Sequence, residues 1–229
     1  MNDSRRLAEL ADNLACRSRL GLSKVAGSRE DLAQLMDAVM PAAPTPRFTS
    51  LAQVRQWMGE CTRCSLSRGR NKIVFGSGPE DARIMFIGEG PGAQEDRQGL
   101  PFVGPAGKLL DAMLAAVGLR REQVYIANIV KCRPPGNRDP QTEEVAACRP
   151  FLEAQVKVIA PAAICTLGRP AAHALLGSDA PMGRLRGQWS RALGVPVLPT
   201  YHPAYLLRTP EAKALAYADL KALVKGPTP

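Results

Sequence analysis

Four runs rich in apolar residues alternate along the chain with stretches in which apolar positions recur at helical spacing. The runs occupy residues 83–88, 123–130, 162–167 and 195–201. Helical stretches between and after them begin near Pro105, Thr142, Pro170 and the Thr209-Pro210 pair. Strands that alternate with helices form parallel sheets covered on both faces. The pattern therefore predicts an α/β fold of three layers, αβα, around a central four-stranded parallel sheet.

Residues 1–47 carry a different pattern. Apolar positions at helical spacing within residues 4–40 predict two short helices, and the segment PAAPTPR at 41–47 is too rich in proline for a helix or a central strand. We expect an N-terminal helical extension with a proline-rich linker at 1–47 and one catalytic domain at 48–229. No apolar stretch has the length of a signal peptide or a membrane span, so we expect a cytoplasmic, nucleoid-associated protein without a membrane partner.

The residues that follow the apolar runs carry the candidate chemistry, because ligands of parallel sheets bind at the carboxyl ends of the strands. The first run ends in the turn Gly88–Gly92, the second at Asn128, the third at Gly168 and the last at His202. Glu89 stands at the centre of the glycine turn, and a carboxylate there argues against a phosphate ligand. A histidine in this position either caps its own loop or takes part in a site.

Four of the six cysteines have the spacing of ligands for a metal centre. Cys61-x-x-Cys64 opens the main domain, while Cys132 and Cys148 lie downstream with fifteen residues between them. Four thiolates hold either zinc or a [4Fe-4S] cluster. The wide second pair, followed by prolines, favours an iron-sulfur cluster over a zinc knuckle. Cys165 in an apolar run and Cys16 in the extension are interpreted as core residues.

Five motifs in one order resemble a known family. They are GEGPGAQED at 88–96, GLPFVGPAGKLL at 99–110, YIANIVKCRPPGNRDP at 125–140, the four cysteines, and HPAYLLR at 202–208. Together they cover about residues 55–224 and are similar to the type 4, iron-sulfur uracil-DNA glycosylases. The resemblance implies the uracil-DNA glycosylase fold and a monofunctional hydrolase of base excision repair that leaves an abasic site. A related branch bonds covalently to DNA through a histidine near the third cysteine, and this chain has none there.

The resemblance also implies how the base is held. A glycosylase extrudes its nucleotide from the duplex and recognises the base in a pocket. Phe102 would stack on the flipped uracil, and Asn128 would accept from N3–H and donate to O4. Ordinary core packing for Phe102, and a tie to a neighbouring loop for Asn128, are the alternatives.

Bond cleavage leaves negative charge on uracil and positive charge on the sugar. By resemblance, His202 donates a hydrogen bond to O2, where the negative charge develops. Glu89 orients the attacking water or stabilises the sugar cation, with Glu95 as a second candidate for that role. The main-chain amides around Gly88 and Gly90 contact the base.

The remaining implied residues contact DNA. A leucine of the pair Leu206 and Leu207 would fill the space left by the base, and packing under the last helix is the alternative for one of them. Arg208 would bind phosphate, and the four-cysteine centre would hold the loop of Arg133 and Arg138 against DNA. The net charge of +9 fits a polyanionic partner, either single- or double-stranded DNA. We expect a monomer that replication or repair proteins recruit.

Two other function classes fit part of the sequence. A non-catalytic iron-sulfur module that binds nucleic acid at the replication machinery would account for the charge and the cysteines, but not for the polar residues at the strand ends. An enzyme acting on nucleotide phosphates would use the glycine turn, but the turn has neither the lysine nor the glycine spacing of a Walker loop.

Overall fold

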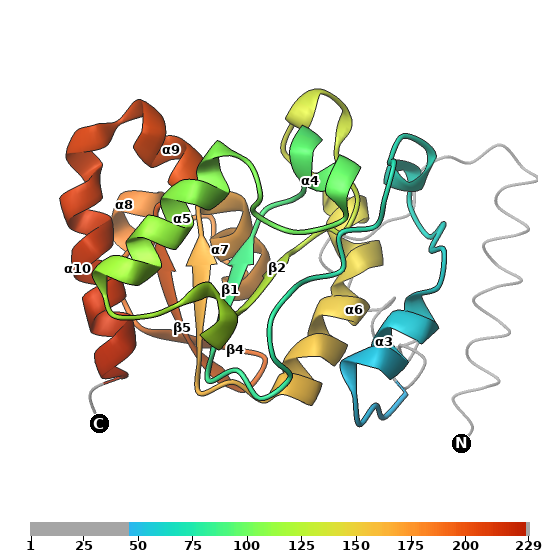
Figure 1. Ribbon diagram of the computed structural model, residues 1–229, viewed down its shortest axis with the longest axis horizontal. Helices are drawn as coiled ribbons and strands as arrows, with labels where there is room; N and C mark the ends of the chain where they lie inside the picture. The colour runs from blue at the N-terminus through green and yellow to red at the C-terminus, as the bar shows by residue number, and fades with distance from the viewer. Residues whose placement is uncertain (1–45, 228–229) are drawn as a thin grey trace, which may run out of the picture. The chain divides into compact units, whose positions relative to one another are not determined.

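The computed structural model describes residues 46–227 of the chain (Figure 1). The two predicted N-terminal helices, most of the linker and Cys16 lie outside the described residues. Within the described part, no helix combines the length and the apolar content that crossing a membrane requires.

A five-stranded sheet with the order β2-β1-β3-β5-β4 forms the centre of the domain. Its parallel strands are β1 (Ile84–Gly88), β2 (Tyr125–Asn128), β3 (Ala163–Leu167) and β5 (Val195–Thr200). These are the four predicted strands, each within two residues of its expected ends. The fifth strand, β4 (Ser190–Ala192), pairs antiparallel with β5 at the edge of the sheet, so the prediction of a four-stranded, purely parallel sheet was wrong in this detail.

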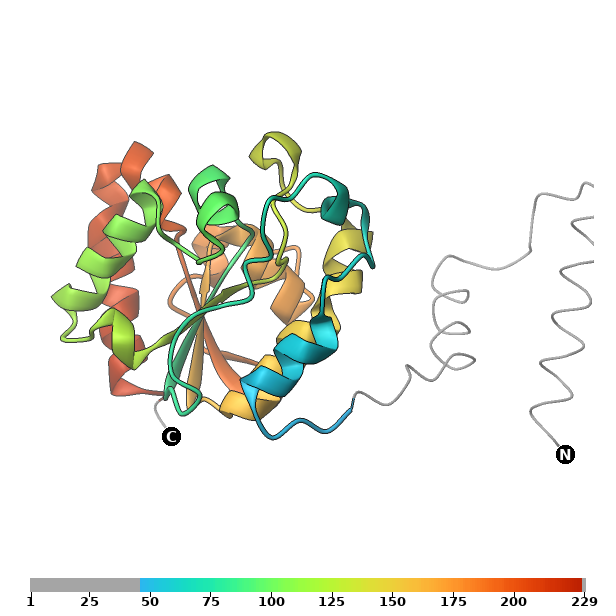
Figure 2. The same cartoon turned by 45° about the vertical axis from the view of Figure 1, so that its right-hand side comes forward.

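Helices cover both faces of the sheet, which confirms the predicted three layers (Figures 1 and 2). On one face, α5 (Pro105–Ala116) and α10 (Lys213–Lys225) pack Leu110, Leu114 and Leu220 against Phe86 of β1. On the other face, α6 (Thr142–Ile159) and α7 (Arg169–Leu176) pack against Met85 and Ile87. Side chains of consecutive strand residues point to opposite faces, so the continuous apolar run of β1 supplies both cores.

The remaining elements are short. Helix α3 (Leu51–Met58) begins at Ser50, whose hydroxyl accepts from the N–H of Gln53, and it packs against α6. The others are α4 (Ala93–Gln98), α8 (Met182–Leu185), α9 (Pro203–Arg208), η1 (Ser65–Arg68), η2 (Arg121–Gln123), η3 (Pro135–Asn137) and η4 (Pro210–Ala212). Helices α4 and α9 both lie at the upper end of the sheet in Figure 1, where the parallel strands end.

Candidate active site

A cleft of about 440 Å³ opens at the carboxyl ends of the strands, a volume typical of small-molecule sites. It gathers side chains from the glycine turn, from the loops after β2 and before α5, and from α9. Its lining includes Glu89, Glu95, Phe102, Asn128, Arg138, Asp139, His202, Tyr205 and Arg208. The residues predicted from the strand ends are therefore brought together.

Gly88 makes room for the two residues that were predicted to hold a base. It pairs with Asn128 in the register between β1 and β2. A Cβ atom on Gly88 would come within 2.5 Å of Asn128 Oδ1 and 2.6 Å of the Phe102 ring. Only glycine lets both side chains reach this position.

Asn128 lines the cleft and carries an unpaired acceptor. Its side chain is buried, and Oδ1 has no hydrogen-bond partner in the described structure. Its main-chain carbonyl instead accepts from the ammonium group of Lys131 at 2.9 Å. Buried polar atoms are nearly always paired, so an unpaired acceptor on a residue that lines the cleft marks a candidate contact for a ligand atom.

Phe102 is held in an unusual backbone conformation. Its φ is +52°, which is rare for a residue other than glycine. Arg121 donates to the carbonyl of Phe102 at 3.1 Å, and Glu95 accepts from the amides of Val103 and Gly104 at 2.9 Å each. Such strain persists only where neighbours enforce it and is common at ligand sites. Phe102 also belongs to the core beneath α5, so its ring forms both core and cleft wall.

His202 presents one defined nitrogen to the cleft. Its Nδ1 accepts from the N–H of Ala204 at 3.0 Å, so the neutral ring carries its proton on Nε2. Burial and the nearby Arg208 lower the pKa of His202 to about 4, with Glu95 acting in the opposite direction. Its ring centroid lies 5.6 Å from that of Phe102. The imidazole is therefore a neutral Nε2–H donor beside the ring of Phe102. His202 also caps the N-terminus of α9, which agrees with the alternative interpretation of this histidine as a loop cap.

Glu89 has a raised pKa. Burial is the main cause, the carboxylate of Asp139 adds to it, and Arg169 opposes it, which together bring the pKa of Glu89 to about 7. Asp139 itself forms an ion pair with Arg169 at 3.0 Å. A carboxyl group that titrates near neutral pH suits acid-base work.

The two leucines of α9 have opposite environments. Leu207 is 45% exposed, whereas Leu206 is fully buried among Ala212 and Ala216. The side chain of Leu206 therefore forms part of the core, as the alternative expected for one of the two leucines, and its burial does not support the predicted contact with DNA. Arg208 is exposed and lines the cleft.

Arg138 is committed to an ion pair. Its guanidinium donates to both carboxylate oxygens of Glu144, at 2.9 and 2.7 Å. Arg138, with help from Gln141 and Ser65, lowers the pKa of the buried Glu144 to about 2. This pair fastens the loop after β2 to the start of α6, while the guanidinium stays partly exposed at the cleft.

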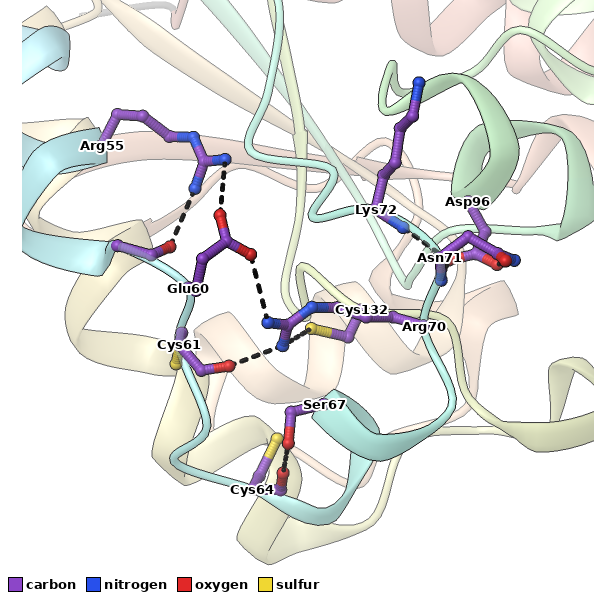
Figure 3. A network of polar contacts seen from close by, with 11 residues as sticks. Arg55, Glu60, Cys61, Cys64, Ser67, Arg70, Asn71, Lys72, Asp96 and Cys132 are labelled. Carbon is purple, nitrogen blue, oxygen red and sulfur yellow. Dashed lines mark hydrogen bonds and ion pairs between the residues drawn. The ribbon is translucent and has the colours of Figure 1, made fainter.

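The four predicted cysteines line one small apolar pocket between α3, α6 and the loop after β2. The guanidinium of Arg63, within the Cys61-x-x-Cys64 loop, lies 4.7 Å from the ring centroid of Trp57 and 4.5 Å from that of Phe151. Arg70 donates to the carbonyl of Cys61 at 2.5 Å and to Cys132 Sγ at 3.5 Å (Figure 3).

Cations lie beside the thiols of this pocket. Burial raises the pKa of Cys148 to about 11, but the adjacent Lys131 opposes this effect, as Arg70 does for Cys132. Such neighbours favour thiolates. Within residues 46–227, no group of three or more His, Cys, Asp or Glu side chains is arranged to hold a metal ion. Cys165 is buried in β3 apart from the pocket, as predicted.

Comparison with known proteins identifies the fold. Residues 75–221 match the family model of the Uracil DNA glycosylase superfamily. The chain belongs to the uracil-DNA glycosylase superfamily. A type-4 uracil-DNA glycosylase of Thermotoga maritima is 48% identical over 157 residues, which are 68% of this chain and 82% of that protein. Those of Sulfurisphaera tokodaii and Archaeoglobus fulgidus are each 41% identical over 76% of this chain, and the matches cover 83% and 92% of those proteins. The resemblance drawn from the five motifs is confirmed.

Two residues that line the cleft, Asp139 and Tyr205, were missing from the prediction, as was Arg169, which pairs with Asp139. Asp139 stands in the quoted GNRDP segment, and Arg169 directly follows the strand-end Gly168, so their positions in the sequence carried a signal. Tyr205 is 37% exposed, and its ring centroid lies 4.9 Å from that of Tyr201. Nothing in the local sequence distinguishes its ring from one packed in the core.

Proposed function

We propose that this chain is a uracil-DNA glycosylase of DNA repair, which flips uracil out of DNA and hydrolyses its N-glycosidic bond to leave an abasic site. The observation that carries the proposal is the buried Oδ1 of Asn128, an acceptor without a partner on a residue that lines the same cleft as Phe102. Uracil offers a matching donor at N3–H and a flat ring for the phenylalanine.

Base selection follows from this amide. Asn128 Oδ1 accepts from N3–H of uracil while Nδ2 donates to O4. Cytosine has an acceptor at N3 and a donor at its exocyclic nitrogen, so both pairs would be mismatched. Unpaired buried polar groups cost about 1–3 kcal/mol each, which is enough to reject cytosine.

His202 and Glu89 act on the two charges that cleavage creates. The Nε2–H of neutral His202 donates to uracil O2, and this hydrogen bond strengthens as the leaving base becomes anionic. Glu89, as a carboxylate, orients the water that attacks the sugar and stabilises its developing positive charge. The glycine turn therefore carries a carboxylate because its ligand is a developing cation.

DNA is held around the mouth of the cleft. Leu207 enters the space left by the extruded base, Arg208 binds a backbone phosphate, and Arg138 presents its partly exposed guanidinium to the strand. Within seven residues, the motif HPAYLLR thus combines a hydrogen-bond donor to the leaving base (His202), a leucine that fills the vacated space (Leu207) and a cation that binds phosphate (Arg208).

Cys61, Cys64, Cys132 and Cys148 would hold a [4Fe-4S] cluster. The four cysteines line one pocket, which Lys131 also lines, and Arg70 donates to Cys132 Sγ. Four cysteines around one pocket match the ligand set of such a cluster. The cluster would have a structural role, because hydrolysis needs no change of redox state.

The decisive experiment uses a labelled oligonucleotide with one uracil, followed by alkaline cleavage and gel electrophoresis. We expect strand cleavage with uracil and none with cytosine or thymine at the same position. Binding of the oligonucleotide without any excision would instead support the non-catalytic iron-sulfur module.

The variant Asn128→Asp tests base selection directly. Its carboxyl group accepts from the exocyclic nitrogen of cytosine and, when protonated, donates to N3. We expect loss of most uracil excision and slow cytosine excision that increases toward acid pH. Uracil excision at the wild-type rate would show that Asn128 does not recognise the base.

A further inference from the structure

Asp96 is a buried carboxylate that takes no part in the chemistry proposed above. It belongs to α4, the helix that follows the glycine turn, and is only 1% exposed. Its Oδ1 accepts from the main-chain N–H of Asn71 at 2.8 Å and of Lys72 at 3.5 Å, and its Oδ2 accepts from Asn71 Nδ2. The carboxylate thus binds α4 to the segment 70–72.

The same segment is bound to the cysteine pocket at its other end. Arg70 directly precedes Asn71 and is only 9% exposed in its side chain. Its guanidinium donates to Cys61 O and Cys132 Sγ and lies 3.7 Å from the carboxylate of Glu60. Figure 3 shows this continuous path, with Cys61 and Cys132 on one side of residues 70–72 and Asp96 on the other.

Helix α4 connects the anchored segment 70–72 to the cleft. Glu95 precedes Asp96 and accepts from the amides of Val103 and Gly104, which fixes the loop that holds the strained Phe102. The N-terminus of α4 also follows the turn of Glu89 directly. A helix of six residues makes few hydrogen bonds of its own, so its position depends on such tertiary contacts.

We infer that Asp96 is a positioning residue, which couples the cysteine centre to the uracil cleft by anchoring residues 70–72 to α4. The inference rests on the proposed function for its effect on catalysis. The contacts themselves are independent of that function. Asp96 acts through Glu95 and the Phe102 loop, and it touches neither base nor sugar.

The test compares Asp96→Ala with the exchanged pair Asn71→Asp/Asp96→Asn. In the pair, the carboxylate and the amide change places, so the side-chain hydrogen bond forms again with donor and acceptor reversed. Asn71→Asp alone places two carboxylates against each other. Asp179→Ala, at an exposed loop position, is the matched control.

Amide hydrogen exchange at Val103 and Gly104 is the first readout, together with iron content and visible absorbance. We expect Asp96→Ala and Asn71→Asp to accelerate hydrogen exchange at these two amides without loss of iron or of visible absorbance. The double variant Asn71→Asp/Asp96→Asn should return hydrogen exchange to the wild-type rate. The control should change nothing. Exchange at the wild-type rate in Asp96→Ala, or loss of the metal centre together with faster exchange throughout the sheet, would overturn the inference.

Uracil excision is the second readout. We expect Asp96→Ala to lower kcat on the order of a hundredfold with little change in KM, since small displacements of catalytic groups have effects of this size. The exchanged pair should recover most of kcat. A failure to recover kcat, when exchange at 103–104 is restored, would overturn the coupling. A wild-type protein without excision would refute the proposed function, while the exchange data would still decide the role of Asp96.

Discussion

The ammonium group of Lys131 lies in the core and donates to the main-chain carbonyl of Asn128 at 2.9 Å. The same ammonium group donates a second hydrogen bond, to Gln155 Oε1 at 2.7 Å. Burial lowers the pKa of Lys131 to about 8, and the adjacent Cys148 opposes that effect. One side chain thus joins the end of β2, at Asn128, to the pocket lined by the four cysteines.

Lys131→Met should destabilise the protein. The substitution keeps the length of the side chain but leaves the Asn128 carbonyl and Gln155 Oε1 without their donor, at about 1–3 kcal/mol each. Denaturant unfolding should show a lower midpoint with an unchanged slope. Lys157→Met, on the exposed face of α6, is the control and should leave the midpoint in place. Equal midpoints for both variants would contradict the structural role of Lys131.

His202→Ala should lower turnover far more than DNA binding, because its hydrogen bond strengthens only as uracil becomes anionic. Loss of one such donor costs on the order of a hundredfold or more in kcat. His173→Ala is the control, since that imidazole contacts the Ala180 carbonyl away from the cleft. Weak DNA binding with normal excision at saturation would make His202 a binding residue instead.

The pH dependence of excision should report Glu89. In the proposed mechanism its carboxylate is the active form, so kcat should rise with pH and level off above the pKa of about 7. Asp139→Asn removes a neighbour that raises this pKa and should move the acid limb to lower pH. Arg169→Ala removes a cation that lowers it and should move the limb to higher pH.

The pH experiment needs a control, because other charged groups line the same cleft. Glu95, Arg138, His202 and Arg208 line the same cleft, and His202 stays neutral at pH 7 because its pKa is about 4. Glu89→Gln should therefore abolish the limb near pH 7 altogether. A limb that survives in Glu89→Gln would assign the titration to another group.

Leu206→Ala and Leu207→Ala should separate stability from DNA contact. Truncation of the fully buried Leu206 should cost about 2–5 kcal/mol of unfolding free energy, as for other core leucines. Truncation of the exposed Leu207 should leave stability within about 0.5 kcal/mol but slow excision from duplex DNA. The reverse pattern would place the wedge at Leu206.

The purified protein should carry about four irons per chain and absorb broadly in the visible range. Cys132→Ala should lose the absorbance and, through the loop it shares with Arg133, weaken DNA binding. Cys165→Ala is the matched control, because that thiol is buried in β3 away from the pocket. Fully active, colourless protein that contains zinc would remove the cluster assignment.

The sequence by itself determined the layers and the edge of the sheet that carries the site. Buried parallel strands are continuous apolar runs, so the ends of 83–88 and 123–130 were visible as changes of composition. Asn128 and His202 stand at such ends, and the cysteine spacing requires no knowledge of packing. The strand ends and the residue spacings are properties of the sequence itself, so they can be predicted without knowing how the chain packs.

Only the tertiary structure decided which neighbouring residues face the core. Leu206 and Leu207 are equally apolar, and the six residues of α9 are too few to show a helical period. Strand β4 has the sequence SRA, without an apolar pattern, and forms only because the edge of β5 offers free hydrogen-bonding groups.

The partners and the burial of the charged residues depended most strongly on the tertiary structure. Asp139 and Arg169 lie 30 residues apart, and only the tertiary fold brings the loop of Asp139 and the start of α7 to Glu89. A lysine is expected at the surface, yet Lys131 is buried because Asn128 and Gln155 supply acceptors for its ammonium. The partners that satisfy a buried charge come from distant segments, so the sequence around the charge does not reveal them.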